Sequence, residues 1–127
     1  MDQAGGFEMT ALPVVLLVTA AAALGAYLLL LWFRRERRPV LIGCHVLLGL
    51  GAAESLVVLI HTGLDDASPH RRLALVAGGF LAAAIASGFS APLFGRAYRV
   101  AANGLLAAHV AAGLGGFLIV LAFASQL

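Results

Sequence analysis

The sequence alternates four long apolar stretches with short polar connections. The apolar stretches cover residues 11–33, 40–61, 73–94 and 100–124. Each is close to the ~20 residues that an α-helix needs to cross the ~30 Å hydrocarbon core of a bilayer. The pattern therefore predicts an all-α fold, a four-transmembrane-helix bundle in which residues 1–127 form a single integral membrane domain.

The composition excludes an ordinary soluble domain, since 62% of the residues are hydrophobic and only 11% are charged. The connections are too short to hold a separate catalytic domain, so any chemistry must lie within the bundle or at its rims. All basic residues are arginines that flank the apolar stretches. We therefore interpret the net charge of +2 as a topology signal and expect no nucleic-acid partner.

The arginines also predict the orientation of the helices. Six of the eight basic residues lie in segments 34–38 and 96–99, whereas the connection 61–72 carries two, offset by two aspartates. Arginine-rich loops stay on the cytoplasmic side, so both termini are expected to face outward (N-out/C-out). Arginine with abundant alanine and glycine, and no lysine, indicates the cytoplasmic (inner) membrane of a bacterium.

Local signals predict where the helices begin and end. Thr10 is expected to cap the first helix, with Pro13 in its first turn, where a missing N–H is harmless. Pro39 is expected to open the second helix, and Ser68, which a proline follows, to cap the third. Pro92 is expected to bend or end the third helix.

An internal repeat relates the two halves of the chain. Residues 45–51 read HVLLGLG and residues 109–115 read HVAAGLG, which match at five of seven positions with an offset of 64 residues. This offset is the length of one helical hairpin, so the chain is predicted to be two fused helical hairpins in a parallel repeat, with a pseudo-twofold axis along the membrane normal. The alternative is chance, because alanine, leucine and glycine are abundant.

The repeated histidines are the main candidates for chemistry. A histidine within an apolar span is costly to leave unpaired, so His45 and His109 are expected to face the interior. The proposed axis would place them at the same depth, facing one another. Gly49 and Gly113 follow four residues later on the same helical faces, which leaves bare backbone where a flat macrocycle could pack.

This arrangement suits a porphyrin held between two axial histidines. Arg38 and Arg99 lie near the ends of the same helices, where they would bind the propionates of a haem. Paired histidines on the second and fourth helices of a four-helix membrane bundle resemble the small bis-histidine b-type cytochromes. The resemblance covers the bundle plan and the two histidines only. It implies that His45 and His109 ligate the iron of haem b.

Two other interpretations of the histidine pair remain open. In one, His45 and His109 are polar contacts between helices, and the glycines permit close packing. In the other, the pair binds a non-haem metal or relays protons.

Glu54 is a second candidate site, on the opposite face of its helix from His45. His61 lies two turns further on the same face, so the two side chains would handle protons or edge a quinone pocket. The alternative is a neutral Glu54 that hydrogen-bonds to Ser87, to Ser90 or to another subunit.

The connection between the second and third helices offers possible ligands for zinc or copper. They are His61, Asp65, Asp66 and His70. Their spacing matches no specific metal motif. A solvated turn, in which the aspartates balance Arg71 and Arg72, is the alternative that we favour.

The leading functional prediction is a membrane-embedded, haem-binding electron-transfer subunit rather than a stand-alone enzyme. Its partners would be the lipid bilayer, other membrane redox subunits, a quinone and a second copy of the chain. Two alternatives are a cofactor-free, proton-coupled small transporter that uses Glu54 and a scaffolding subunit of a larger membrane complex.

Overall fold

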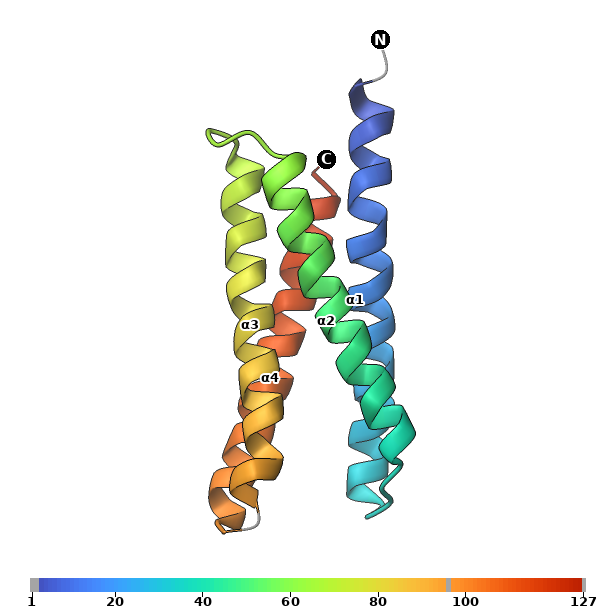
Figure 1. The fold of residues 1–127 in the computed structure, drawn as a ribbon, viewed down its shortest axis with the longest axis vertical. Coiled ribbons are helices and arrows are strands. Elements are labelled where there is room, and N and C mark those ends of the chain that lie inside the picture. Colours follow the sequence, from blue (N-terminus) through green and yellow to red (C-terminus); the bar gives the residue numbers. More distant parts are fainter. Residues whose placement is uncertain (1–2, 96, 127) are drawn as a thin grey trace.

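The computed structural model describes residues 3–95 and 97–126, and side-chain surroundings for 11–94 and 97–126. This part of the chain forms four α-helices joined by short connections (Figure 1). The helices are α1 (Gln3–Phe33), α2 (Pro39–Thr62), α3 (Pro69–Gly95) and α4 (Arg99–Ala124). All four contain stretches that are long and apolar enough to cross a membrane, which confirms this prediction and indicates a multi-pass membrane protein.

Successive helices run in opposite directions and form two hairpins. The α1–α2 and α3–α4 connections lie at one end, the hairpin-loop end, whereas the α2–α3 connection and both termini lie at the other, the terminal end (Figure 1). Contact is most extensive within each hairpin, and α2–α3 and α1–α4 make smaller contacts. In the described part of the chain α1 makes no close backbone contact with α3, nor α2 with α4, so these pairs lie on the diagonals of the bundle.

The predicted starts of the second and third helices are right. Pro39 is the first residue of α2. Ser68 caps α3, because its Oγ accepts a hydrogen bond from the backbone N–H of His70 at 3.1 Å. The predicted start of the first helix is wrong. Since α1 begins at Gln3, Thr10 and Pro13 both lie inside it.

The predicted end of the third helix at Pro92 is also wrong. Pro92 lies inside α3, which continues to Gly95. Unpaired backbone groups are costly in an apolar environment, so helices at membrane depth continue through prolines that would stop a helix in water.

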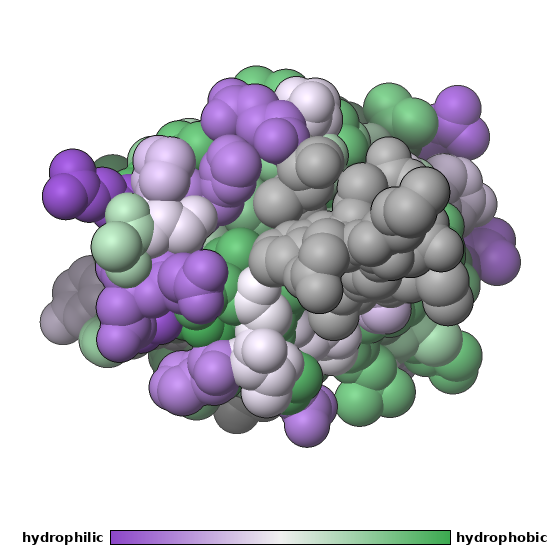
Figure 2. All heavy atoms as spheres, turned by 90° about the horizontal axis from the view of Figure 1, so that it is seen from above, coloured by the Kyte–Doolittle hydropathy of each residue, from purple (hydrophilic) through white to green (hydrophobic). Residues whose placement is uncertain are grey.

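The buried core lies in the half of the bundle nearer the terminal end, and Leu31 of α1 is buried separately near the hairpin-loop end. Each helix contributes inward-facing side chains from consecutive turns, and most are small or aliphatic. They are Ala11, Val14, Val18 and Ala21 of α1, Ala52, Leu56, Leu59 and Ile60 of α2, Ala74, Ala77, Leu81 and Ala84 of α3, and Gly116, Val120 and Phe123 of α4. Figure 2 looks onto the terminal end, where hydrophilic residues gather at the surface.

The two hairpins diverge toward the hairpin-loop end (Figure 1). None of the residues of α2 at positions 39–51, and none of those of α4 at 99–115, is buried. The core therefore stops close to the level at which His45 and His109 lie, and the inward faces beyond it are partly open.

We expect Leu56→Ala to destabilise the bundle by about 2 kcal/mol, because Leu56 is 1% exposed and its loss leaves a cavity. Leu47→Ala, on the same helix but 70% exposed, should change the free energy of unfolding by less than ~0.5 kcal/mol. Reversible unfolding in mixed micelles measures both values. Equal losses for the two variants would contradict the position of the core.

Candidate functional site

His45 and His109 meet in the middle of the bundle. They come from α2 and α4, which lie on a diagonal, and their ring centroids are 5.8 Å apart with the ring planes at 81°. Both side chains are half-buried. The prediction that the two imidazoles face one another is confirmed.

Each imidazole is held by the other helix of its own hairpin. The Nδ1 of His45 lies 3.0 Å from the carbonyl oxygen of Ala21 on α1, and the Nδ1 of His109 lies 2.7 Å from that of Ala84 on α3. A carbonyl oxygen only accepts hydrogen bonds, so Nδ1 must carry the proton in both rings. In the neutral imidazole the Nε2 atom then keeps a free lone pair, which is the tautomer that metal-binding histidines commonly use.

Two glycines make room for the imidazoles. A Cβ atom on Gly25 of α1 would lie 2.9 Å from Cε1 of His45, and one on Gly88 of α3 would lie 2.8 Å from Nδ1 of His109. Real Cβ atoms essentially never come this close to another heavy atom, so bare backbone is needed at both places.

Sequence analysis did not select Gly25 and Gly88, although a signal was available. Each glycine follows by four residues, one helical turn, the alanine whose carbonyl accepts the imidazole proton. Ala21 and Gly25 are separated from Ala84 and Gly88 by nearly the same offset that relates the two histidines.

The glycines that sequence analysis did select behave differently from one another. A Cβ atom on Gly49 would have no heavy atom within 4 Å, so space is open beside it. A Cβ atom on Gly113 would contact Cβ of Ala84 at 4.0 Å. Space is therefore open beside Gly49 of α2 and filled by Ala84 beside Gly113 of α4.

The pair offers two nitrogen ligands for one metal ion. Metal–imidazole bonds of about 2.0–2.1 Å on opposite sides of one ion would place the ring centroids about 6.4 Å apart. The observed 5.8 Å is slightly shorter and also lies in the range of ordinary edge-to-face ring contacts. Two neutral imidazoles with their Nδ1 protons already engaged are the ligands that a b-type haem uses.

The predicted propionate partners lie at the hairpin-loop end. Arg38 immediately precedes α2 and Arg99 is the first residue of α4, and both are exposed. Arg38 forms an ion pair with Glu36 at 3.7 Å. The structure does not bring either arginine to the imidazoles, but it places both at the end toward which the hairpins diverge.

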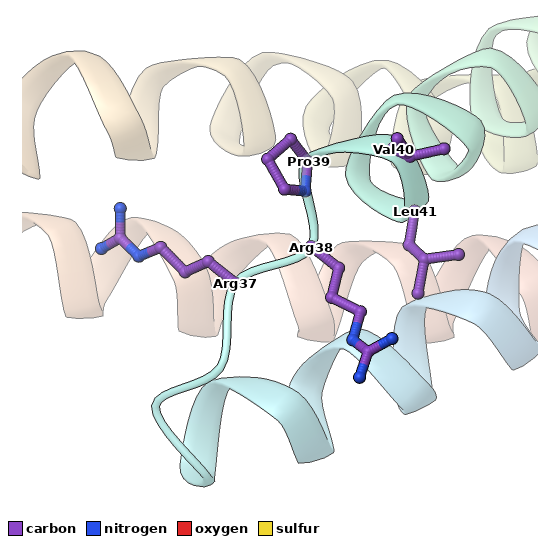
Figure 3. A pocket seen from close by; sticks show the side chains of 5 residues that line it. All are labelled: Arg37, Arg38, Pro39, Val40 and Leu41. Carbon is purple, nitrogen blue, oxygen red and sulfur yellow. The ribbon is translucent and has the colours of Figure 1, made fainter.

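A shallow cavity of about 500 Å³ lies at the start of α2 (Figure 3). Its lining residues are Arg37, Arg38, Pro39, Val40 and Leu41. Leu41 lies one turn before His45, so the cavity adjoins the inward face of α2 at the open end.

Glu54 lies outside this site, on the exposed side of α2. The hydroxyls of Ser87 and Ser90 donate to carbonyls of their own helix at 2.7 Å, so the structure does not pair Glu54 with either serine. His61 is also exposed, and its Nδ1 lies 2.9 Å from the carbonyl oxygen of Val57.

The α2–α3 connection has the character of a solvated turn. Arg71 forms an ion pair with Asp66, as the sequence predicts. The ring of His70 packs edge-on against Phe123 with centroids 6.5 Å apart. Among the residues that the structure describes, no group of three or more His, Cys, Asp or Glu side chains is placed to hold a metal ion.

No protein family, no curated protein and no solved structure matches this chain. The geometry of the histidine pair is therefore the main basis for assigning a function.

We expect Gly25→Ala and Gly88→Ala each to destabilise the protein by about 1–3 kcal/mol, because the new methyl group collides with an imidazole that cannot retreat from its carbonyl partner. Nitrogen-15 NMR of the labelled histidines should show a weakened Nδ1 hydrogen bond in each variant. The matched control is Gly79→Ala in α3, where a Cβ atom meets nothing within 4 Å. If the control variant behaved like the other two, close contact at the imidazoles would not be the cause.

Proposed function

We propose that this chain binds haem b between its two hairpins and acts as a membrane-embedded electron-transfer subunit. His45 and His109 are the proposed axial ligands. The observation that carries the proposal is the juxtaposition of two imidazoles from diagonal helices, 5.8 Å apart, with both Nδ1 protons engaged by carbonyl oxygens.

A purely structural role for the histidines explains the hydrogen bonds of their Nδ1 atoms but not the unbonded Nε2 atoms. One hydrogen bond within each hairpin is sufficient to tie α2 to α1 and α4 to α3. No hydrogen bond to either Nε2 is found among the described residues, and neither Nε2 is fully buried, so both lone pairs are accessible. A metal ion between the rings would use both lone pairs, which favours ligation over a structural contact.

The protein groups around the pair have distinct roles in this proposal. The carbonyls of Ala21 and Ala84 fix the orientation of the imidazoles and increase their basicity as ligands. The bare backbone at Gly49 leaves space for one face of a macrocycle.

Arg38 and Arg99 supply positive charge for carboxylates at the hairpin-loop end. Haem supplies reversible one-electron chemistry, and the low-dielectric surroundings tune its potential.

We also propose that the two hairpins are equivalent halves related by a pseudo-twofold axis along the membrane normal. Buried positions support this, because those of α1 recur in α3 at an offset of 63 residues and those of α2 recur in α4 at an offset of 64. In α1 and α3 the pairs are Ala11 and Ala74, Val14 and Ala77, Val18 and Leu81, and Ala21 and Ala84; in α2 and α4 they are Ala52 and Gly116, Leu56 and Val120, and Leu59 and Phe123.

The arginine distribution supports an N-out/C-out orientation in a bacterial cytoplasmic membrane. The proposed partners are other membrane redox subunits and a quinone. No observation favours the transporter alternative, since Glu54 lies on the outside of the bundle. A scaffolding role would not require His45 and His109 to lie close together.

We expect protein purified after expression with added haem precursor to show a Soret band and the sharp reduced-minus-oxidised bands of six-coordinate b-type haem. His45→Ala and His109→Ala should each abolish this spectrum, because one imidazole cannot hold a bis-histidine centre. His61→Ala is the matched control and should leave the spectrum unchanged, since His61 is exposed and bonded to its own helix. Wild-type protein that folds but shows no haem absorbance would overturn the proposal.

The perpendicular imidazoles allow a further spectroscopic prediction. Ring planes at 81° make the two iron dπ orbitals nearly equal in energy, which increases the orbital contribution to the magnetic moment. We therefore expect the oxidised protein to give a strongly anisotropic low-spin EPR signal with one large g value. A rhombic signal typical of parallel imidazole planes would show that the hydrogen bonds to Ala21 and Ala84 do not set the ring orientations.

A further inference from the structure

Glu54 is the only acidic residue in the four candidate spans. Its side chain is exposed on the surface of the bundle, well inside α2, where lipid would surround it. A charged residue at the centre of a membrane helix is costly to insert, and even a neutral carboxyl needs a hydrogen-bond partner there. The described residues of this chain supply none, since Ser87 and Ser90 of α3 donate to their own helix.

Glu54 belongs to a continuous exposed stripe along α2, which we call the α2 stripe. Successive members are separated alternately by four and three residues, which is the heptad spacing of helices that pack as a left-handed pair. Its members are Gly43, Leu47, Leu50, Glu54, Val57 and His61, all of them exposed. In Figure 1, α2 crosses the front of the molecule with no helix in front of it.

We propose that the α2 stripe binds the α2 stripe of a second copy of this chain, forming a parallel twofold dimer in the membrane. Copies inserted with the same orientation are related by an axis along the membrane normal, so each residue meets its counterpart at the same depth. The two Glu54 carboxyls then face one another in their neutral form, in which each donates one O–H and accepts one hydrogen bond. Gly43, with nothing within 4 Å of a Cβ position, allows the backbones to approach.

A second copy fits the α2 stripe because the Glu54 carboxyl of one copy can hydrogen-bond to the Glu54 carboxyl of the other. Glu54 is the only polar member of the stripe away from its end, since His61 lies at the last position and bonds to its own helix. A polar residue within an apolar heptad seam fixes the register of a pairing, since any slip along the helix separates the two polar groups and leaves both in lipid. The stripe also lies on the opposite side of α2 from His45. The dimer therefore leaves the histidine pair untouched, and the two proposals fail or succeed independently.

Disulfide cross-linking of the full-length chain in membranes tests the contact. In a Cys44→Ser background, Leu50→Cys and Val57→Cys, whose native side chains are 42% and 54% exposed, should form dimers on mild oxidation. The matched control is Leu118→Cys, which is 55% exposed and lies at a similar distance from the terminal end on α4. It should stay monomeric. Equal cross-linking at all three positions, or none at Leu50→Cys and Val57→Cys, would overturn the proposal.

Substitution of Glu54 tests the role of the carboxyl. Glu54→Gln keeps a donor and an acceptor, so its dimerisation constant, measured by energy transfer between labelled copies in liposomes, should stay within about threefold of the wild type. Glu54→Leu removes both groups and should weaken dimerisation about tenfold. A Glu54→Leu variant that associates as tightly as the wild type would overturn the assignment of Glu54 as the pairing group.

Discussion

The hydrogen bond from each imidazole to a backbone carbonyl within its own hairpin is the interaction on which the candidate site depends. It ties α2 to α1 through His45 and Ala21, and α4 to α3 through His109 and Ala84. Because the bond uses Nδ1, it decides which nitrogen is free and where that nitrogen can point. Each hairpin thus carries its own oriented imidazole, and the histidine pair forms when the two hairpins pack together.

The distribution of buried residues explains how such a site can remain accessible. Small and aliphatic side chains close the bundle near the terminal end, where alanine allows the helices to approach. Toward the hairpin-loop end the hairpins diverge, and the inward faces of α2 and α4 are no longer buried (Figure 1). The histidine pair lies near the boundary between these two regions, so packed helices hold it on one side and partly open space adjoins it on the other.

The two faces of α2 carry different chemistry. One face presents His45 to the centre of the bundle, and the other presents Glu54 to the surroundings. In an apolar medium each polar side chain needs a partner, but the partners come from different places. His45 finds a carbonyl within the chain and an imidazole across the bundle. Glu54 finds none among the described residues, which is why its partner is sought in another copy of the chain.

The sequence by itself determined the features that depend on local composition and periodicity. Hydropathy predicts the four helices, Pro39 and Ser68 mark two helix starts, and the repeated motif predicts that the two histidines meet. Only the tertiary structure decided which helix supports each imidazole, because a hydrogen bond to a main-chain carbonyl leaves no trace in the identity of the residue that carries it. The recurrence of Ala21 and Gly25 at Ala84 and Gly88 is visible in the sequence, but only the packing of the rings shows that these two glycines are the ones that make room for them. The exposure of Glu54 and the continuation of the helices through Pro13 and Pro92 likewise depend on the packing and the apolar environment, which local signals do not contain.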